Sequence, residues 1–330
     1  MTIQRRRFLP LVVFPVALPA WSRSSLAKGY PTRPLTLVVP YAPGGSADTL
    51  PRIVAERMAG ILGSPILVAN VTGAAGSIGT ARVAQAQPDG YTFGLGTWST
   101  HVANGAVYKL PYDVRTDFEP IAQLAFSPLV FATSSKVPAH SLTELIAWLK
   151  VNPDPASLAT NGAGSIMHLA GTLLRQRTGT RFNVVPYRGS APALQDLLSG
   201  RVDLYLGLPA DVVPHVRNGA VRIHAIASSH RSTAATHIPT TDEAGLPGFH
   251  VSAWFGLWAP KDTDTSVIAR LNMAARAALA DPAVRHRLQQ EMLLEIPQPE
   301  QQTPQALRRL QDAEIEKWWP VIRAADIKGG

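Results

Sequence analysis

The stretch LTLVVPYAPGGSADTLPRIVAERMAGIL, residues 35–62, decides the fold, because it predicts a buried strand, a loop of small residues and an amphipathic helix. The strand is predicted over residues 35–39, where apolar and β-branched residues dominate, and Pro40 ends it. Gly44 and Gly45 place no side chain over the backbone amides of the loop. The apolar residues of the helix share one face, and its positive end lies at the loop. An anion would be favoured at this point.

The start of this helix is expected to be held by its own polar residues. Ser46 or Asp48 is predicted to cap the helix through a side-chain oxygen, and Pro51 is tolerated in the first turn. A glycine turn without any ligand is the alternative, since many α/β proteins connect strand to helix in this way. The recurrence of similar units favours the ligand-holding interpretation.

Similar units follow along the chain. The predicted strands lead into small or polar residues; they span residues 66–70, 91–95, 158–161 and 182–186, and the segments after them are 73–79, 96–101, 162–165 and 187–190. In open α/β sheets, ligands bind beyond the carboxyl ends of the strands. The sequence therefore predicts an α/β protein whose strand ends face a ligand.

The length of 330 residues suits two domains. A strand over residues 129–133 is expected to cross between the domains, and residues 251–259 are expected to return. We predict an export signal at residues 1–27, a first domain from residues 28–128 plus 254–330, and a second domain from residues 129–253. The C-terminal part is predicted to be helical.

The N-terminus carries the pattern of an export signal. Arginines at residues 5–7 precede an apolar segment over residues 8–20, and the small-residue site Ser25, Leu26, Ala27 follows. The order Arg5, Arg6, x, Phe8 is similar to a twin-arginine signal. Cleavage after Ala27 would lower the formal charge from +8 to about +4, because it removes four arginines and no acidic residue.

Composition excludes several classes of function. The chain has no cysteine, so disulfides, thiolate metal sites and thiol nucleophiles are absent. The basic residues of the mature chain are scattered, which argues against nucleic-acid binding. Neither a GxGxxG fingerprint nor an HExxH motif is present, and we expect no cofactor and no metal.

Three aromatic positions and one histidine draw attention near the predicted strand ends. His101 is interpreted as a loop histidine, since no second ligand lies at a metal-binding spacing. Trp98 either favours a flat ligand or shields the mouth of the cleft. Trp254 and Trp258 either line the cleft or pack in a core, and the core is the preferred interpretation.

A serine-dependent hydrolase is the alternative from another functional class. Ser46, Ser165 or Ser190 would be the nucleophile, and His101 or His168 the base. No GxSxG elbow, P-loop or paired-carboxylate motif supports this activity. Ser165 is instead predicted to cap the helix that follows it, so the chain is not predicted to be an enzyme.

Several blocks of sequence, in the same order, resemble the Bug-type solute receptors of tripartite tricarboxylate transporters. They are YPTRP at residues 30–34, PYAPGGSAD at 40–48, PDGYT at 88–92, VPYRGSAPAL at 185–194 and AGLPG at 244–248. The resemblance implies a type II periplasmic binding protein, with two α/β domains joined by crossing strands around a cleft. It also implies a periplasmic receptor that closes over a small carboxylate and passes it to transmembrane permease subunits. A sensor that docks on a signalling partner is the alternative, and a monomer is expected.

By this resemblance, backbone amides and hydroxyls hold the carboxylate of the ligand, partly through water. The matching positions in the first domain are Tyr41, Ala42, Gly44, Gly45, Ser46 and Asp48, with Gly96 and Thr97 opposite. In the second domain they are Gly164, Ser165, His168, Tyr187, Gly189 and Ser190. A second carboxylate would use the loop of the second domain.

One departure from the family pattern concerns Gly207. Family members often carry an aspartate at this strand end, where it could meet an amino group of the ligand. Its absence here argues against an amino-acid ligand. Aromatic, aliphatic, di- and tricarboxylate ligands all remain compatible with the predicted loops.

Overall fold

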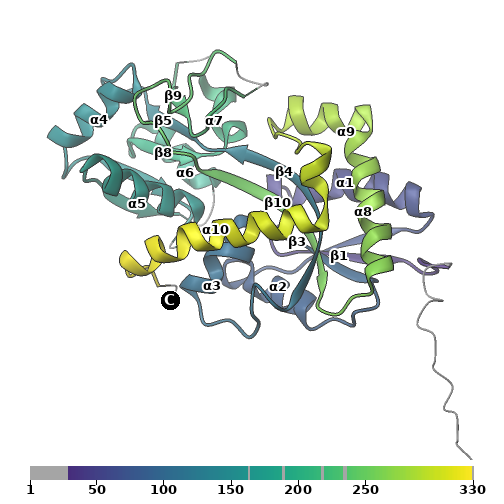
Figure 1. Cartoon of the computed structure of the whole chain (residues 1–330). Helices are drawn as coiled ribbons and strands as arrows, with labels where there is room; N and C mark the ends of the chain where they lie inside the picture. The colour runs from purple at the N-terminus through teal and green to yellow at the C-terminus, as the bar shows by residue number, and fades with distance from the viewer. Residues whose placement is uncertain (1–28, 163, 188–189, 217–218, 233–235, 329–330) are drawn as a thin grey trace, which may run out of the picture.

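A computed structural model describes residues 29–162, 164–187, 190–216, 219–232 and 236–328 (Figure 1). The predicted export signal and the predicted site residue Gly189 lie outside these residues. The described chain forms two five-stranded sheets, each covered by helices on both faces. The predicted α/β class is therefore confirmed.

The first sheet has the order β2-β1-β3-β10-β4. Its strands are β1 (Leu35–Val39), β2 (Ile66–Asn70), β3 (Thr92–Thr97), β4 (Phe118–Pro128) and β10 (Ser252–Pro260). Strands β1, β2 and β3 are parallel, while β10 runs antiparallel to β3 and β4. Helices α1 (Ser46–Leu62) and α8 (Thr265–Ala280) pack together on one face, and the other face carries α2 (Ser77–Ala84) and α10 (Pro304–Ala324). We call this part the first lobe.

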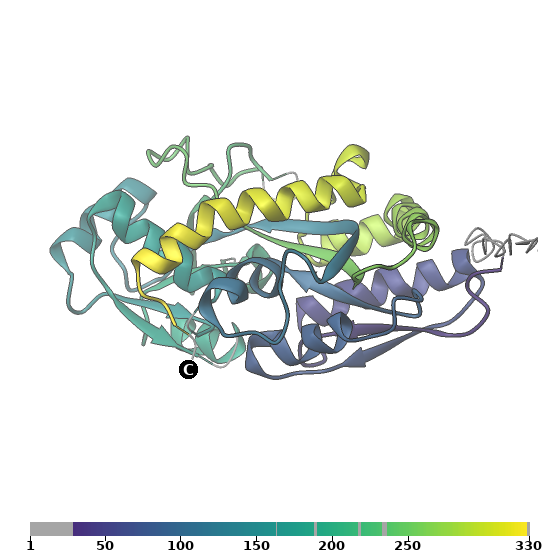
Figure 2. The same cartoon turned by 60° about the horizontal axis from the view of Figure 1, so that its bottom comes forward.

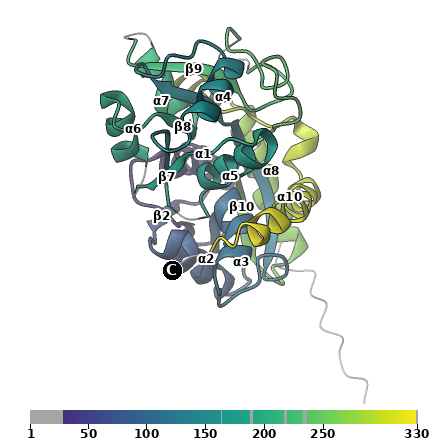
Figure 3. The same cartoon turned by 90° about the vertical axis from the view of Figure 1, so that its left-hand side faces the viewer.

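The second sheet has the order β7-β6-β8-β5-β9. Its strands are β5 (Val130–Ser134), β6 (Ser157–Thr160), β7 (Asn183–Pro186), β8 (Leu204–Gly207) and β9 (Val221–Ile226). One face carries α4 (Leu142–Val151) and α5 (Ile166–Thr178), and the other carries α6 (Ser190–Ser199) and α7 (Pro209–Val216). We call this part the second lobe; it lies above the first in the side view of Figure 3.

The chain changes sheet at Leu129, between the end of β4 and the start of β5. Here three backbone segments are hydrogen-bonded to one another: Leu129 N donates to Val251 O (2.9 Å), Ala227 N to Leu129 O (2.7 Å) and Val251 N to Ala227 O (3.1 Å). Residues from both lobes thus meet in one short ladder. We call the three segments around residues 129, 227 and 251 the hinge of the molecule, because the chain passes between the two sheets there.

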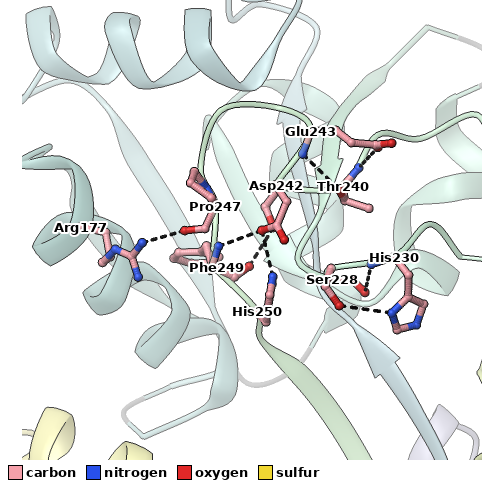
Figure 4. Close-up of polar contacts among 12 residues, drawn as sticks. Arg177, Ser228, His230, Thr240, Asp242, Glu243, Pro247, Phe249 and His250 are labelled. Carbon is pink, nitrogen blue, oxygen red and sulfur yellow. Dashed lines mark hydrogen bonds and ion pairs between the residues drawn. The ribbon is translucent and has the colours of Figure 1, made fainter.

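The segment that leads back to the hinge is braced by polar contacts (Figure 4). Thr240 and Glu243 exchange hydrogen bonds between side chain and amide, as their capping-box spacing predicts, although a turn rather than a helix follows. Asp242 Oδ1 accepts the Gly248 amide (2.8 Å) and contacts His250 Nε2 (2.9 Å). Arg177 of α5 donates to Pro247 O (2.7 Å) and so ties this segment to the second lobe.

Helix α10 runs along both lobes, as Figures 1 and 2 show. It packs on β4 and on the π-helical turn Ser99–Ala103 of the first lobe, and it reaches α5 of the second. Lys317 donates to His250 O (2.9 Å) beside the hinge. The remaining elements near the C-terminus are α9 (Pro282–His286), the π-helical turn Arg287–Glu291 and the 3-10 helix Pro299–Gln302.

Most predicted elements are present within a few residues of their expected bounds. Ser141 caps α4, since its side chain accepts the Glu144 amide at 3.1 Å. The cap predicted for the first helix is wrong: Gly45 is the N-cap of α1 and no side chain caps it. Pro51 lies one turn further into the helix than expected. No helix in the described part of the chain has the length and apolar character needed to cross a bilayer.

Candidate ligand-binding cleft

A cavity of about 540 Å³ lies between the two lobes. The first lobe contributes the loop between β1 and α1, the end of β3 and residues 253–255 of β10; Leu129 of the hinge also lines it. The second lobe contributes residues of α5, α6 and α7 and the end of β8. A larger hollow of about 670 Å³ lies on the outside of the first lobe, between α2 and residues 108–111, and none of the predicted site residues lines it.

The loop between β1 and α1 is held from beneath by Asp48. Gly44 has a φ of 94°, which favours glycine, and its amide donates to Asp48 Oδ2 (2.9 Å). Arg52 (2.9 Å) and Asn70 (2.7 Å) also donate to the carboxylate. Burial alone would raise the pKa of the Asp48 carboxyl, but these hydrogen bonds outweigh it and lower the pKa. Asp48 is buried and does not line the cavity, so the structure gives it a supporting position rather than the predicted ligand contact.

The amides after Gly44 are the open donors of this loop. Gly45, Ser46 and Ala47 all line the cavity, as do Tyr41 and Ala42. The first amides of an α-helix have no backbone acceptor within the helix. Helix α1 has 17 residues, and its dipole places partial positive charge at the same point. The structure thus brings helix-start amides to the cavity wall, as the sequence predicted.

The end of β3 forms the adjoining wall. Thr97 lines the cavity, and its hydroxyl shares a hydrogen bond with Tyr41 Oη (2.7 Å). The Thr97 amide is bonded to Thr100 Oγ1 (2.9 Å), and the Thr97 hydroxyl also accepts the Thr100 amide (3.3 Å), so both groups of Thr97 already have partners in the protein. Burial raises the pKa of Tyr41 to about 12, which keeps its hydroxyl protonated at neutral pH.

Tryptophans form a fixed part of the cavity wall. Trp98 is almost fully buried, donates from Nε1 to Glu314 Oε2 (2.7 Å) and meets the Trp318 ring edge-on at 5.3 Å. It lines the cavity, but α10 holds it in place, so it does not shield the mouth. Trp254 and Trp258 are buried as predicted, and Trp254 also borders the cavity.

His101 is a core residue, and its interpretation as a loop histidine is wrong. It is 2% exposed, lies in the π-helical turn Ser99–Ala103 and stacks on Trp258 with ring centroids 4.6 Å apart. Burial, together with the charge of Arg308, lowers its pKa to about 3. No local sequence pattern indicates this burial, because the stacking partner is more than 150 positions away.

The small-residue loop of the second lobe occupies a different position from its counterpart in the first lobe. The Gly164 amide donates to His168 Nδ1 (3.3 Å), and Ser165 caps α5 by accepting the His168 amide (3.3 Å). Gly164 packs so closely on Val107 of the first lobe that an added Cβ would lie 3.0 Å from it. Gly164, Ser165 and His168 do not line the cavity; their neighbours Asn161, Ile166 and Met167 do.

The start of α6 reaches the cavity, but the strand before it does not. Ser190 lines the cavity and accepts a hydrogen bond from Asn161 Nδ2 (3.3 Å). Tyr187 does not line it, because its hydroxyl donates to Asp196 Oδ2 (2.7 Å) on the side of α6. Of the predicted residues Tyr187, Gly189 and Ser190, Gly189 lies outside the described residues, and of the other two only Ser190 lines the cavity.

Asp211 is a cavity residue that the sequence reasoning missed. It lies in the first turn of α7, just beyond the end of β8, and its Oδ2 accepts the Tyr205 hydroxyl (2.6 Å). Burial raises the pKa of its carboxyl, although hydrogen bonds from Tyr205 and Ser190 act in the opposite direction. A signal was available, because Asp211 follows a strand end by four residues, where ligand contacts are expected in α/β sheets.

The cavity is lined mainly by neutral groups. Among the described lining residues, Asp211 alone carries a formal charge. Ser46, Ser165 and Ser190 show no hydrogen bond to an imidazole ring in the described structure. No three His, Asp or Glu side chains of the described chain gather in a way that would hold a metal ion.

Comparison with known proteins identifies the family of this two-lobed arrangement. Residues 50–327 match the model of TctC, the tripartite tricarboxylate transporter family receptor. The chain belongs to this family. The suspected resemblance to Bug-type receptors is therefore confirmed.

Solved structures of similar proteins agree with this assignment. MatC (Rpa3494) from Rhodopseudomonas palustris, with bound malate, is 38% identical with a TM-score of 0.79, over 89% of this chain and 100% of that one. The periplasmic binding protein BugD is 36% identical with a TM-score of 0.79, over 91% and 99%. R. palustris Rpa4515, with adipate, is 34% identical with a TM-score of 0.82, over 91% and 99%. The TctC family chain described here thus has the predicted architecture of a two-domain periplasmic binding protein.

Proposed function

We propose that this TctC family receptor captures a small organic carboxylate in the cavity between its lobes, with the carboxylate at the start of α1. The observation that carries the proposal is the set of amides at Gly45, Ser46 and Ala47, which line a cavity without any cationic side chain among its described residues. Similar proteins with bound malate and adipate support this ligand class.

The available donors are sufficient for binding of the expected strength. A charge-assisted hydrogen bond contributes about 1.5–3 kcal/mol, and micromolar affinity corresponds to about 8 kcal/mol. Three amides close to the helix dipole supply donors of this kind. Lost translational and rotational freedom offsets part of this energy.

Binding is coupled to closure in this proposal, since the ligand contacts both lobes. Gly45 and Ser46 approach it from the first lobe, while Asn161 and Ser190 approach it from the second. The hinge at Leu129 connects the two walls. A ligand in contact with both walls stabilises the closed state relative to the open one.

We further propose that residues 1–27 direct export to the periplasm, and that the receptor acts there as a monomer. It releases the unaltered ligand to transmembrane permease subunits and performs no chemical turnover. The family supports the partnership with a transporter. The lack of a serine–imidazole bond at Ser46, Ser165 and Ser190 supports binding without catalysis.

Thermal unfolding of the chain that lacks residues 1–27, measured against a panel of carboxylates, tests the proposal. A ligand at 100 times its dissociation constant adds about 2.7 kcal/mol to stability, which is readily measured. Stabilisation by at least one carboxylate, without any product in the recovered ligand, is the expected result. A panel of mono-, di- and tricarboxylates without any stabilising member would contradict the proposal.

A further inference from the structure

The second lobe presents a carboxylate to the ligand cavity. Asp211 lines this cavity together with Gly207, Leu208 and Ser190, opposite the amides at the start of α1. The remaining second-lobe wall is mainly apolar, with Ile166, Met167, Ala191 and Leu194. The two lobes therefore line the cavity with groups of different charge.

Tyr205 fixes the position of this carboxylate. Its ring is fully buried, and its hydroxyl donates to Asp211 Oδ2 at 2.6 Å. A Cβ atom at Gly207 would lie 2.1 Å from the same ring, so only glycine at this position leaves room for it. Residues 205 and 207 point to the same face of β8. The absence of a side chain at Gly207 and the placement of Asp211 are thus parts of one arrangement.

The carboxylate of Asp211 retains capacity for further hydrogen bonds. An ionised carboxylate accepts about four hydrogen bonds, and the hydroxyls of Tyr205 and Ser190 occupy two of these positions. Burial disfavours the charged form of Asp211, as its raised pKa indicates, so an additional donor at this point is favourable. A second ionised carboxylate in the same place would instead be repelled, or would have to share a proton.

We propose that Asp211 determines the far end of the ligand, so that the receptor prefers a carboxylate with an ammonium or hydroxyl donor over one with a second ionised carboxylate. This inference rests on the proposed function. In it, the α1 amides receive the carboxylate of the ligand, and Asp211 accepts a hydrogen bond from the donor at the opposite end.

The inference changes two expectations from the sequence. The second lobe was expected to receive another carboxylate through residues 162–165, but Gly164 and Ser165 do not line the cavity. The glycine at position 207 was taken as evidence against an amino-acid ligand, yet Asp211 places a carboxylate near that strand end. Ligands with an amino group are therefore compatible with the site.

Isothermal titration with matched ligands tests the proposal in the chain that lacks residues 1–27. Each set has one carbon-chain length of four to six atoms and four members: the unsubstituted carboxylate, its terminal hydroxy and amino derivatives, and the dicarboxylate. At pH 7.5 we expect the hydroxy or amino member of the best-fitting set to bind at least tenfold more tightly than the dicarboxylate.

Asp211→Asn removes the charge with little change in volume, and it should reduce this ratio at least tenfold. Asp196→Asn is the matched control, because Asp196 also accepts a tyrosine hydroxyl in the second lobe but does not line the cavity. The control should leave the ratio unchanged. If Asp211→Asn does not fold, Asp211→Ser and the titrations of the unmodified chain still measure the preference.

The outcomes separate the inference from the proposed function. If the dicarboxylate binds the unmodified chain as tightly as the donor-bearing members, the inference is wrong while the carboxylate receptor stands. An unchanged ratio in Asp211→Asn would contradict the inference in the same way. If no carboxylate binds at all, both proposals fall.

Discussion

The two lobes have similar loop sequences, but they line the cavity with different groups. In the first lobe, Gly44 and Gly45 expose the amides at the start of α1, and Asp48 supports them from below. In the second lobe, Gly162 and Gly164 belong to a loop that packs on Val107, and Asp211 supplies the polar contact instead. A small-residue loop after a strand therefore indicates a close approach. In the second lobe the approaching group is the Val107 side chain, and in the first lobe we propose that it is the ligand.

The largest effect is expected when an amide of the first lobe is removed. Ser46→Pro deletes one donor, and proline is compatible with the first position of a helix, where Gly45 before it is already extended. We expect a loss of affinity of about 10- to 100-fold, which corresponds to about 1.5–3 kcal/mol for one charge-assisted hydrogen bond. Titration with the best carboxylate measures the loss.

The control for this change is Ser46→Ala, which removes the hydroxyl but keeps the amide. Only the difference between Ser46→Pro and Ser46→Ala reports on the amide. Equal affinities of the two variants would show that the start of α1 does not hold the carboxylate.

A smaller effect, on how the stability of the fold depends on pH, is expected from two buried histidines, one in each lobe. Burial lowers the pKa of His101 to about 3 and that of His224 to about 4, from 6.5 when unfolded. Below pH 6.5 the unfolded chain thus binds more protons than the folded chain. The stability that depends on these two neutral histidines is therefore fully present above that pH and is lost as the pH falls. At pH 5.5 each of these histidines should lower the free energy of unfolding by about 1.4 kcal/mol relative to pH 8.

Urea unfolding at both pH values measures this loss of stability. His224→Asn should remove the part of the loss that comes from the second lobe. A pH dependence that is equal in His224→Asn and in the unmodified chain would exclude His224 as a source.

The smallest effect concerns the contact between the lobes at Gly164. Gly164→Ala places a Cβ 3.0 Å from Val107, whereas Gly162→Ala meets no atom within 4 Å, and both residues have a positive φ. The backbone strain is therefore similar in the two variants. We expect Gly164→Ala to lower the free energy of unfolding by about 1 kcal/mol more than Gly162→Ala, since a packed interface resists added volume.

Urea denaturation of the two variants gives the difference directly. In the Val107→Ala background, Gly164→Ala should lower the free energy of unfolding much less than in the unmodified chain, because Val107→Ala makes space for the added methyl group. Equal stabilities of the two single variants would mean that Gly164 and Val107 are not tightly packed against each other.

Local sequence patterns predicted the strands, the helices and the loop between β1 and α1. Such features depend on residues close in the chain, and so does the Ser165 cap of α5. The positions of His101, Gly164 and Asp211 depend on partners that folding brings together, namely Trp258, Val107 and Tyr205. For His101 and Gly164, the partner lies in a distant part of the chain.

Helix α10 restricts how the receptor exchanges solute with its surroundings. The helix contacts the first lobe, the hinge region and α5 of the second lobe, so it connects the two lobes along one edge of the molecule. Separation of the lobes is then greatest at the edge farthest from α10. Solute should therefore pass in and out at that opposite edge, and a permease that accepts it would have to face the receptor from there.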